Sequence, residues 1–314
     1  MTLFDDHPPN PPDENLAAPL GPAHPADSAS PEPVVLPLAG DPISYAAVTA
    51  VVSLSPRPDL PEDLRISWSW VHLICFIIFG FASLLVIQTV FAIHYAPPRP
   101  LPEKELEQYL FSKPQFTVGS NVAWFASLFL FLYVTLSVLP AAPFWRTLGW
   151  RKLKSGRPGT FANPWLYFFC GSALSFLAAL VGSRVHTPDN MPIELLLRSR
   201  TGALLLMGMA VLVAPLVEET VFRGYLYPLL ARWFGIVPGI LLTGLLFGLM
   251  HGAQLGWSWG IVILLIFVGI TFTYVRARTG TVFASYLMHL GYNSLIAVAS
   301  IAGTKGFTQM PPGH

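Results

Sequence analysis

The chain has 314 residues, of which 53% are hydrophobic and 11% are charged, and its net charge is +1. A soluble domain carries about 25% charged residues, so this composition excludes an ordinary soluble protein and predicts an integral membrane protein. No basic arm or Arg-aromatic segment is present, which excludes the usual nucleic-acid-binding classes and predicts no nucleic-acid partner.

Residues 1–64 are predicted to form a disordered, Pro-rich tail. This segment holds 14 of the 30 prolines and a single basic residue, Arg57. Such a composition buries too little apolar surface to offset the entropy lost on ordering.

Apolar runs near the ~20 residues that a bilayer requires predict an all-α, polytopic transmembrane helix bundle with about seven spans. The runs lie at about 68–94, 119–139, 161–182, 201–231, 236–255, 257–276 and 281–302. We therefore expect an N-terminal transmembrane region with a basic loop at 65–158, a core region at 159–304, and a short C-terminal tail at 305–314.

Positive charge predicts the orientation of the spans. Two loops carry basic residues without acidic ones: Arg146, Arg151, Lys152, Lys154 and Arg157 after the second span, and Arg276 and Arg278 after the sixth. Both loops fall on one side if the spans are counted correctly. The rule then predicts a multi-pass protein of the cell membrane with a cytoplasmic N-terminus.

The fifth span carries a stripe of glycines at every fourth position. The stripe consists of Gly244, Gly248, Gly252 and Gly256. Small residues at this spacing let a neighbouring backbone approach closely, so we expect a packing face.

An acidic pair interrupts the fourth span. Glu218 and Glu219 lie in an apolar run, and no acidic residue follows them. A charge at the centre of a membrane helix costs roughly 2.5–3.5 kcal/mol, so such a pair is a candidate functional site. The two side chains lie about 100° apart on an α-helix. Arg223, four residues after Glu219, is predicted to neutralise it and to leave Glu218 facing elsewhere.

Two later spans each add a histidine with a partner on the same helical face. Phe247 and His251 are four residues apart, as are His289 and Asn293. A lone membrane histidine is usually a packing residue, but two such pairs beside a carboxylate pair indicate a shared site.

These residues resemble the three motifs of the CPBP family of intramembrane endopeptidases. The motifs are Glu218-Glu219-x-x-x-Arg223, Phe247-x-x-x-His251 and His289-x-x-x-Asn293, in that order. The family includes type II CAAX prenyl proteases and bacteriocin-processing and immunity (Abi) relatives. The resemblance covers about residues 160–302 and implies that the core region is an intramembrane protease that cuts a membrane-associated peptide or protein.

The resemblance also implies roles for the residues. Glu218 would activate a water molecule with help from His251, while His289 and Asn293 would stabilise the oxyanion. Glu219, Arg223 and Phe247 would support them. No cofactor is favoured, although family members are also described as metalloproteases, and a zinc version would use Glu218, His251 and His289 as ligands.

Two other classes of function stay open at this point. A non-catalytic immunity or scaffold protein could keep these residues for packing. A transporter could use buried Glu and His as a proton relay, but no inverted repeat supports it. The intact set of motifs favours the enzyme.

Overall fold

The structure is a computed structural model that describes residues 61–154, 160–185, 194–197 and 199–308. These residues belong to one folded unit, residues 56–314. Of the tail predicted for residues 1–64, residues 1–60 lie outside the described residues.

The described residues form helices and contain no strand, which confirms the predicted all-α class. The α-helices are α2 (Trp70–His94), α3 (Glu103–Phe111), α4 (Pro114–Tyr133), α5 (Phe144–Thr147), α6 (Pro164–Gly182), α7 (Glu194–Leu197), α8 (Arg200–Gly208), α9 (Ala214–Glu218), α10 (Tyr227–Phe234), α11 (Ile236–Met250), α12 (Trp259–Thr279) and α13 (Val282–Gly303). The 3₁₀ turns are η1 (Glu62–Leu64) and η5 (Ala253–Leu255), and the π-helical segments are η2 (Val134–Val138), η3 (Met209–Val213) and η4 (Glu219–Leu226).

In the described residues, 6 helical stretches are long and apolar enough to cross a membrane. The fifth predicted span, 236–255, is the shorter apolar helix α11, Ile236–Met250, which packs along α12. Its helix stops at Met250 because Gly252 and Gly256 follow in a tight turn, with Gly256 at φ +57°. The chain is a multi-pass membrane protein.

Local sequence signals set several helix ends. Pro114 and Pro164 stand at the first positions of α4 and α6, where a missing N–H costs nothing. The side chain of Thr281 accepts from the backbone N–H of Phe283 and so caps α13. Gly280, at φ +70°, ends α12 in the left-handed conformation that glycine adopts without strain.

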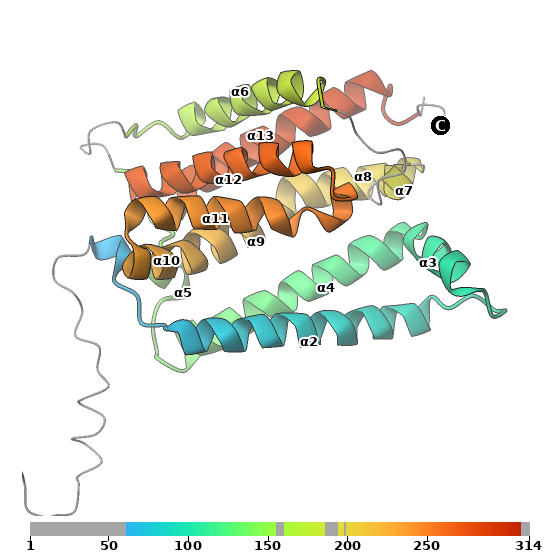
Figure 1. Ribbon diagram of the computed structural model, residues 1–314, viewed down its shortest axis with the longest axis horizontal. Coiled ribbons are helices and arrows are strands. Elements are labelled where there is room, and N and C mark those ends of the chain that lie inside the picture. The colour runs from blue at the N-terminus through green and yellow to red at the C-terminus, as the bar shows by residue number, and fades with distance from the viewer. Residues whose placement is uncertain (1–60, 155–159, 186–193, 198, 309–314) are drawn as a thin grey trace, which may run out of the picture. The chain divides into compact units, whose positions relative to one another are not determined.

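Close backbone contacts join the helices of the core. Figure 1 shows α6, α13, α12 and α11 side by side. A Cβ atom on Gly171 of α6 would lie 1.8 Å from the Met288 carbonyl oxygen of α13, and one on Gly291 would lie 1.9 Å from that of Phe168. Only glycine permits this approach.

The glycine stripe of α11 divides into two parts. Cβ atoms on Gly244 and Gly248 would lie 2.6 and 2.7 Å from backbone nitrogens of α12. These two glycines therefore form the predicted packing face. Gly252 instead packs against the ring of Trp257, and Gly256 serves the turn.

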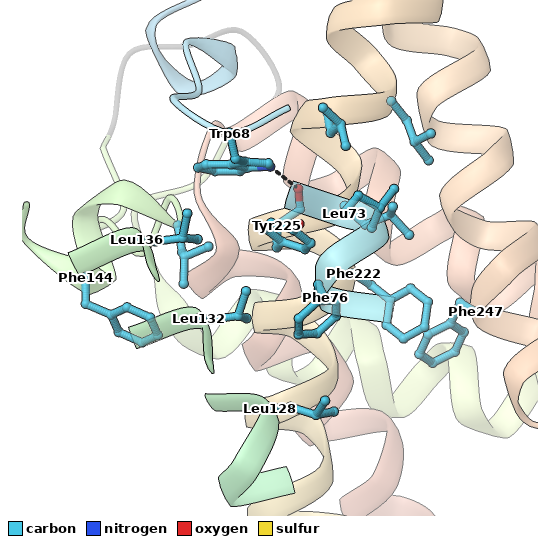
Figure 2. Close-up of a cluster of buried hydrophobic side chains, with 14 residues drawn as sticks. Trp68, Leu73, Phe76, Leu128, Leu132, Leu136, Phe144, Phe222, Tyr225 and Phe247 are labelled. Carbon is cyan, nitrogen blue, oxygen red and sulfur yellow. Dashed lines mark hydrogen bonds between the residues drawn. The ribbon is translucent and has the colours of Figure 1, made fainter. Parts of the chain in front are cut away.

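An N-terminal hairpin of α2 and α4 packs against the segment from η4 to α10. Its contribution to the shared apolar core includes Phe76, Leu128 and Leu132, which meet Phe222 and Tyr225. Figure 2 shows this cluster, with Trp68 lying over Tyr225.

The predicted boundary of the tail, residue 64, falls inside the folded unit. Leu64 is buried, and Asp63 pairs with the buried Arg276 at 2.8 Å. Arg232 also donates to the carbonyl of Ile66 at 3.0 Å. The segment before α2 is therefore fixed to α10 and α12.

The two basic loops meet at one end of the helices, as predicted. The N–H of Val282 donates to the carbonyl of Gly149 at 3.0 Å. The hydroxyl of Thr281 donates to the carbonyl of Arg151 at 2.6 Å. The two connections thus lie at the same end of the helices, although Arg276 and Arg278, predicted to lie in the second loop, belong to the last turn of α12.

Candidate active site

The segment that carries the acidic pair is one long, irregular helical stretch, Arg200–Phe234. It changes from α-helix to π-helix twice. Glu218 is the last residue of α9, and Glu219 is the first residue of the π-helical η4. π-helical turns are rare and occur frequently at functional sites. The change of helix type falls between the two glutamates.

The predicted ion pair between Glu219 and Arg223 is present and fully buried. Arg223 Nη1 donates to Glu219 Oε1 at 2.9 Å, and neither side chain is exposed. A buried pair requires further hydrogen bonds, because desolvation of two charges is costly.

Helix α12 supplies the further hydrogen bonds to Arg223. Arg223 Nη2 donates to the carbonyl of Gly269 at 2.9 Å, and Arg223 Nε donates to the hydroxyl of Thr273 at 3.3 Å. The guanidinium carbon also lies 4.3 Å from the centre of the Phe247 ring. Arg223 thereby holds η4 against α11 and α12.

His289 contacts both glutamates. Its Nδ1 lies 3.0 Å from Glu219 Oε1, which already accepts from Arg223. A carboxylate paired with a guanidinium only accepts, so Nδ1 carries a proton. In the neutral ring the lone pair is then on Nε2, which lies 3.8 Å from Glu218 Oε2.

His251 presents its ring to Glu218 in the same way. Its Nδ1 lies 2.8 Å from the backbone carbonyl of Phe247, which can only accept a hydrogen bond. Nε2 is therefore the unprotonated nitrogen of the neutral ring, and it lies 3.9 Å from Glu218 Oε2. His251 is the first residue after α11, so the end of that helix sets its position.

Three hydrogen-bond acceptors thus converge from three segments of the chain. The side chains of Glu218 and His251 are 18% and 20% exposed, whereas Glu219 is fully buried. The accessible carboxylate is therefore Glu218. Glu218 Oε2, His251 Nε2 and His289 Nε2 cannot hydrogen-bond to one another as acceptors. They therefore need a proton or a hydrogen-bond donor between them.

Asn293 stands one turn beyond His289 on α13. Its side-chain Nδ2 donates to the carbonyl of Ala210 in η3 at 2.7 Å. It therefore ties α13 to the stretch that leads into α9. Phe247 lies between the two histidines, with its ring centre 4.8 Å from that of His251 and 5.8 Å from that of His289.

Sequence reasoning missed the residues that support the site from neighbouring elements. Gly269 and Thr273 bind Arg223, and Phe272 packs against His289 with ring centres 4.8 Å apart. Trp150 donates to the hydroxyl of Thr220 at 3.2 Å. The spacing of Gly269 and Thr273, four apart in an apolar span, is a signal that could have found the α12 face.

In the described part of the chain, no group of three or more His, Cys, Asp or Glu side chains is arranged so that it could hold a metal ion. The residues of the zinc alternative, Glu218, His251 and His289, face one another but do not form such a group.

Residues 200–295 match a family model described as type II CAAX prenyl endopeptidase, Rce1-like. This segment is therefore similar to the Rce1-like type II CAAX prenyl endopeptidases. It contains all three motifs, and the match confirms the family that they indicated. Comparisons with curated proteins and with solved structures return no match to the chain. The matched residues run from α8 through most of α13, whereas α2, α4 and α6 lie outside the match.

Proposed function

We propose that this membrane protein hydrolyses a peptide bond with a water molecule that Glu218 activates. The observation that carries the proposal is the pair of separations from Glu218 Oε2, 3.9 Å to His251 Nε2 and 3.8 Å to His289 Nε2. Both are too long for a direct hydrogen bond and suit groups that share one water.

The proposed reaction follows the acid–base chemistry of these groups. Glu218 takes a proton from the water, and the oxygen of the resulting hydroxide attacks the scissile carbonyl carbon. His251 Nε2 accepts the second hydrogen bond of the water, and Glu218 returns its proton to the departing amine nitrogen as the C–N bond breaks. A positioned acid–base group of this kind contributes about 10²–10⁴-fold to a rate.

His289 and Asn293 are the proposed donors to the oxyanion. A proton on His289 Nε2 would face the developing charge, and Glu219 would stabilise the protonated ring through Nδ1. The second N–H of the Asn293 amide would add a donor. Removing one oxyanion donor costs about 10²–10³-fold in kcat in well-studied hydrolases.

The proposed substrate class comes from the family name. A CAAX prenyl endopeptidase acts on a protein whose C-terminal motif carries a prenylated cysteine. A lipid-linked C-terminus would reach a site within the membrane from the side of the bilayer. We therefore propose a membrane-associated peptide or protein as the substrate.

The experiment compares membranes that contain the wild type, Glu218→Gln and His251→Ala. Peptides from a farnesylated C-a-a-X probe and from endogenous membrane proteins are measured by mass spectrometry. We expect cleavage by the wild type and a loss of at least about 10³-fold in Glu218→Gln, because the amide cannot take the proton. Glu105→Gln, an exposed change on α3, is the matched control.

Two outcomes separate the alternatives. Cleavage that survives Glu218→Gln refutes the glutamate mechanism. A cellular function that survives both substitutions, without any cleavage product, supports the non-catalytic scaffold instead.

We also propose that the end carrying the basic loops faces the cytoplasm, with the N-terminus on that side. The excess of Arg and Lys at this end supports the orientation. A reporter that is active only in the cytoplasm should then be active after fusion to the N-terminus and inactive after fusion to the C-terminus. The reverse pattern would overturn the orientation.

A further inference from the structure

Tyr225 connects the N-terminal hairpin to the segment that carries the acidic pair. It lies two residues beyond Arg223 in η4 and is fully buried. The indole N–H of Trp68 donates to the Tyr225 carbonyl at 3.2 Å, and the two rings stack with centres 5.4 Å apart (Figure 2). The phenol oxygen lies 2.7 Å from Nδ1 of His72, on α2.

Tyr225, His72, Thr135 and the backbone carbonyl of Phe131 form a series of hydrogen bonds. The direction of each bond follows from the Phe131 carbonyl, which can only accept. The Thr135 hydroxyl lies 2.7 Å from the carbonyl of Phe131, which only accepts, so the hydroxyl proton points there. Thr135 must then accept from His72 Nε2–H, 2.9 Å away. His72 Nδ1 is left to accept from the Tyr225 hydroxyl. Each of the three hydrogen bonds between Tyr225 and Phe131 thus has one donor proton and one acceptor.

His72 thereby joins two π-helical segments. Thr135 belongs to η2, Val134–Val138, and Tyr225 belongs to η4, Glu219–Leu226. A π-helical turn contains about one residue more than an α-helical turn, so conversion of η4 to regular α-helix would rotate the side chains before it by about 100° relative to those after it. The register of η4 therefore decides whether Glu219 faces Arg223 and whether Glu218 faces the histidines.

We propose that His72 and Tyr225 are positioning residues, which hold the π-helical register of η4 and with it the two glutamates. The inference rests on the proposed endopeptidase function. It adds that α2 and α4, outside the matched residues 200–295, are required for the catalytic geometry.

The kinetic test uses the full chain in vesicles, with a farnesylated C-a-a-X peptide as the probe. The variants are His72→Ala, Tyr225→Phe and the double variant. We expect each single change to lower kcat about tenfold while KM changes less than about twofold, because positioning acts on the reacting geometry. The double variant should be no slower than the slower single one, since both remove the same contact.

Matched controls come from the same helices or residue types. His94→Ala changes an exposed histidine at the other end of α2, and Tyr274→Phe removes an exposed hydroxyl on α12. Both should leave kcat and KM near the wild type. Folded single variants that keep kcat within about twofold of the wild type would overturn the inference, as would effects that multiply in the double variant.

A second measurement does not depend on activity. Hydrogen exchange followed by mass spectrometry reports the opening of the backbone of η4 in the purified protein. We expect faster exchange over residues 219–226 in His72→Ala and unchanged exchange in His94→Ala. Equal exchange in both would refute the positioning role. If the wild type shows no cleavage that depends on Glu218, the proposed function fails, and this measurement still decides the role of His72.

Discussion

Arg223 and Glu219 form a 2.9 Å ion pair in which neither side chain is exposed. The pair holds the π-helical segment at the centre of the helices and leaves the neighbouring Glu218 as the accessible carboxylate. One member of the acidic pair therefore serves structure, and we propose that the other serves chemistry.

Removal of one partner of the buried pair should destabilise the protein. Arg223→Met leaves an unpaired carboxylate, and the expected cost is about 3–5 kcal/mol in the free energy of unfolding. The double variant Glu219→Gln/Arg223→Met should recover much of the stability but not the activity. Thermal unfolding in detergent measures the first effect and peptide cleavage the second. A single variant as stable as the wild type would contradict this prediction.

The two histidines should respond differently to truncation. His251→Ala removes a ring whose hydrogen bond runs to the carbonyl of Phe247 in the adjoining helix α11, so we expect lost cleavage with little change in stability. His289→Ala also removes a donor to the buried Glu219, which should cost about 1–3 kcal/mol of stability. Cleavage and melting temperature, measured on both variants, test the contrast. Equal losses of stability would show that the contact with Glu219 is unimportant.

Packing of α11 on α12 should depend on the absence of a side chain at Gly248. In Gly248→Ala the new Cβ would lie 2.7 Å from the Ile266 nitrogen, so the helices must separate. Overpacking of this kind costs about 1–3 kcal/mol, and the shift should also displace His251. Gly208→Ala is the control, because its Cβ would meet nothing within 4 Å. Melting temperatures that fall equally in both variants would refute this account.

Metal chelation should leave cleavage intact, because the proposed reaction depends on Glu218 and on protons. We expect activity to survive prolonged treatment with a strong chelator and the purified protein to contain zinc well below one equivalent. A known zinc protease treated in parallel provides the control. Loss of activity that added zinc restores would establish the alternative with Glu218, His251 and His289 as ligands.

Asp63 should contribute more to stability than its neighbour Glu62. Asp63 pairs with the fully buried Arg276, and Asp63→Asn should cost about 3–5 kcal/mol because it leaves that charge without its counter-ion. The pair between Glu62 and Arg151 is largely exposed, so Glu62→Gln should cost less than about 1 kcal/mol. Melting temperatures and proteolysis near residue 65 compare the two. A larger effect in Glu62→Gln would contradict the structure.

The sequence by itself determined what depends on spacing within one helix. The apolar runs indicated the membrane class, the four-residue spacing predicted the pair of Glu219 and Arg223, and the glycine stripe predicted the face of α11 at Gly244 and Gly248. The first follows from the length and apolarity of the runs, and the other two follow from the four-residue spacing, which places side chains on one face of a helix whatever surrounds them.

Only the tertiary structure decided which faces meet. It brought His251 and His289 to within 3.9 and 3.8 Å of Glu218 Oε2, gave Arg223 its partners on α12, and joined His72 to Tyr225, 153 residues apart in sequence. It also bonded Asn293 to the carbonyl of Ala210, a contact that no spacing indicates. The physical reason is that helix packing sets these contacts, and π-helical turns change the rotation per residue without a clear signal in the amino acids.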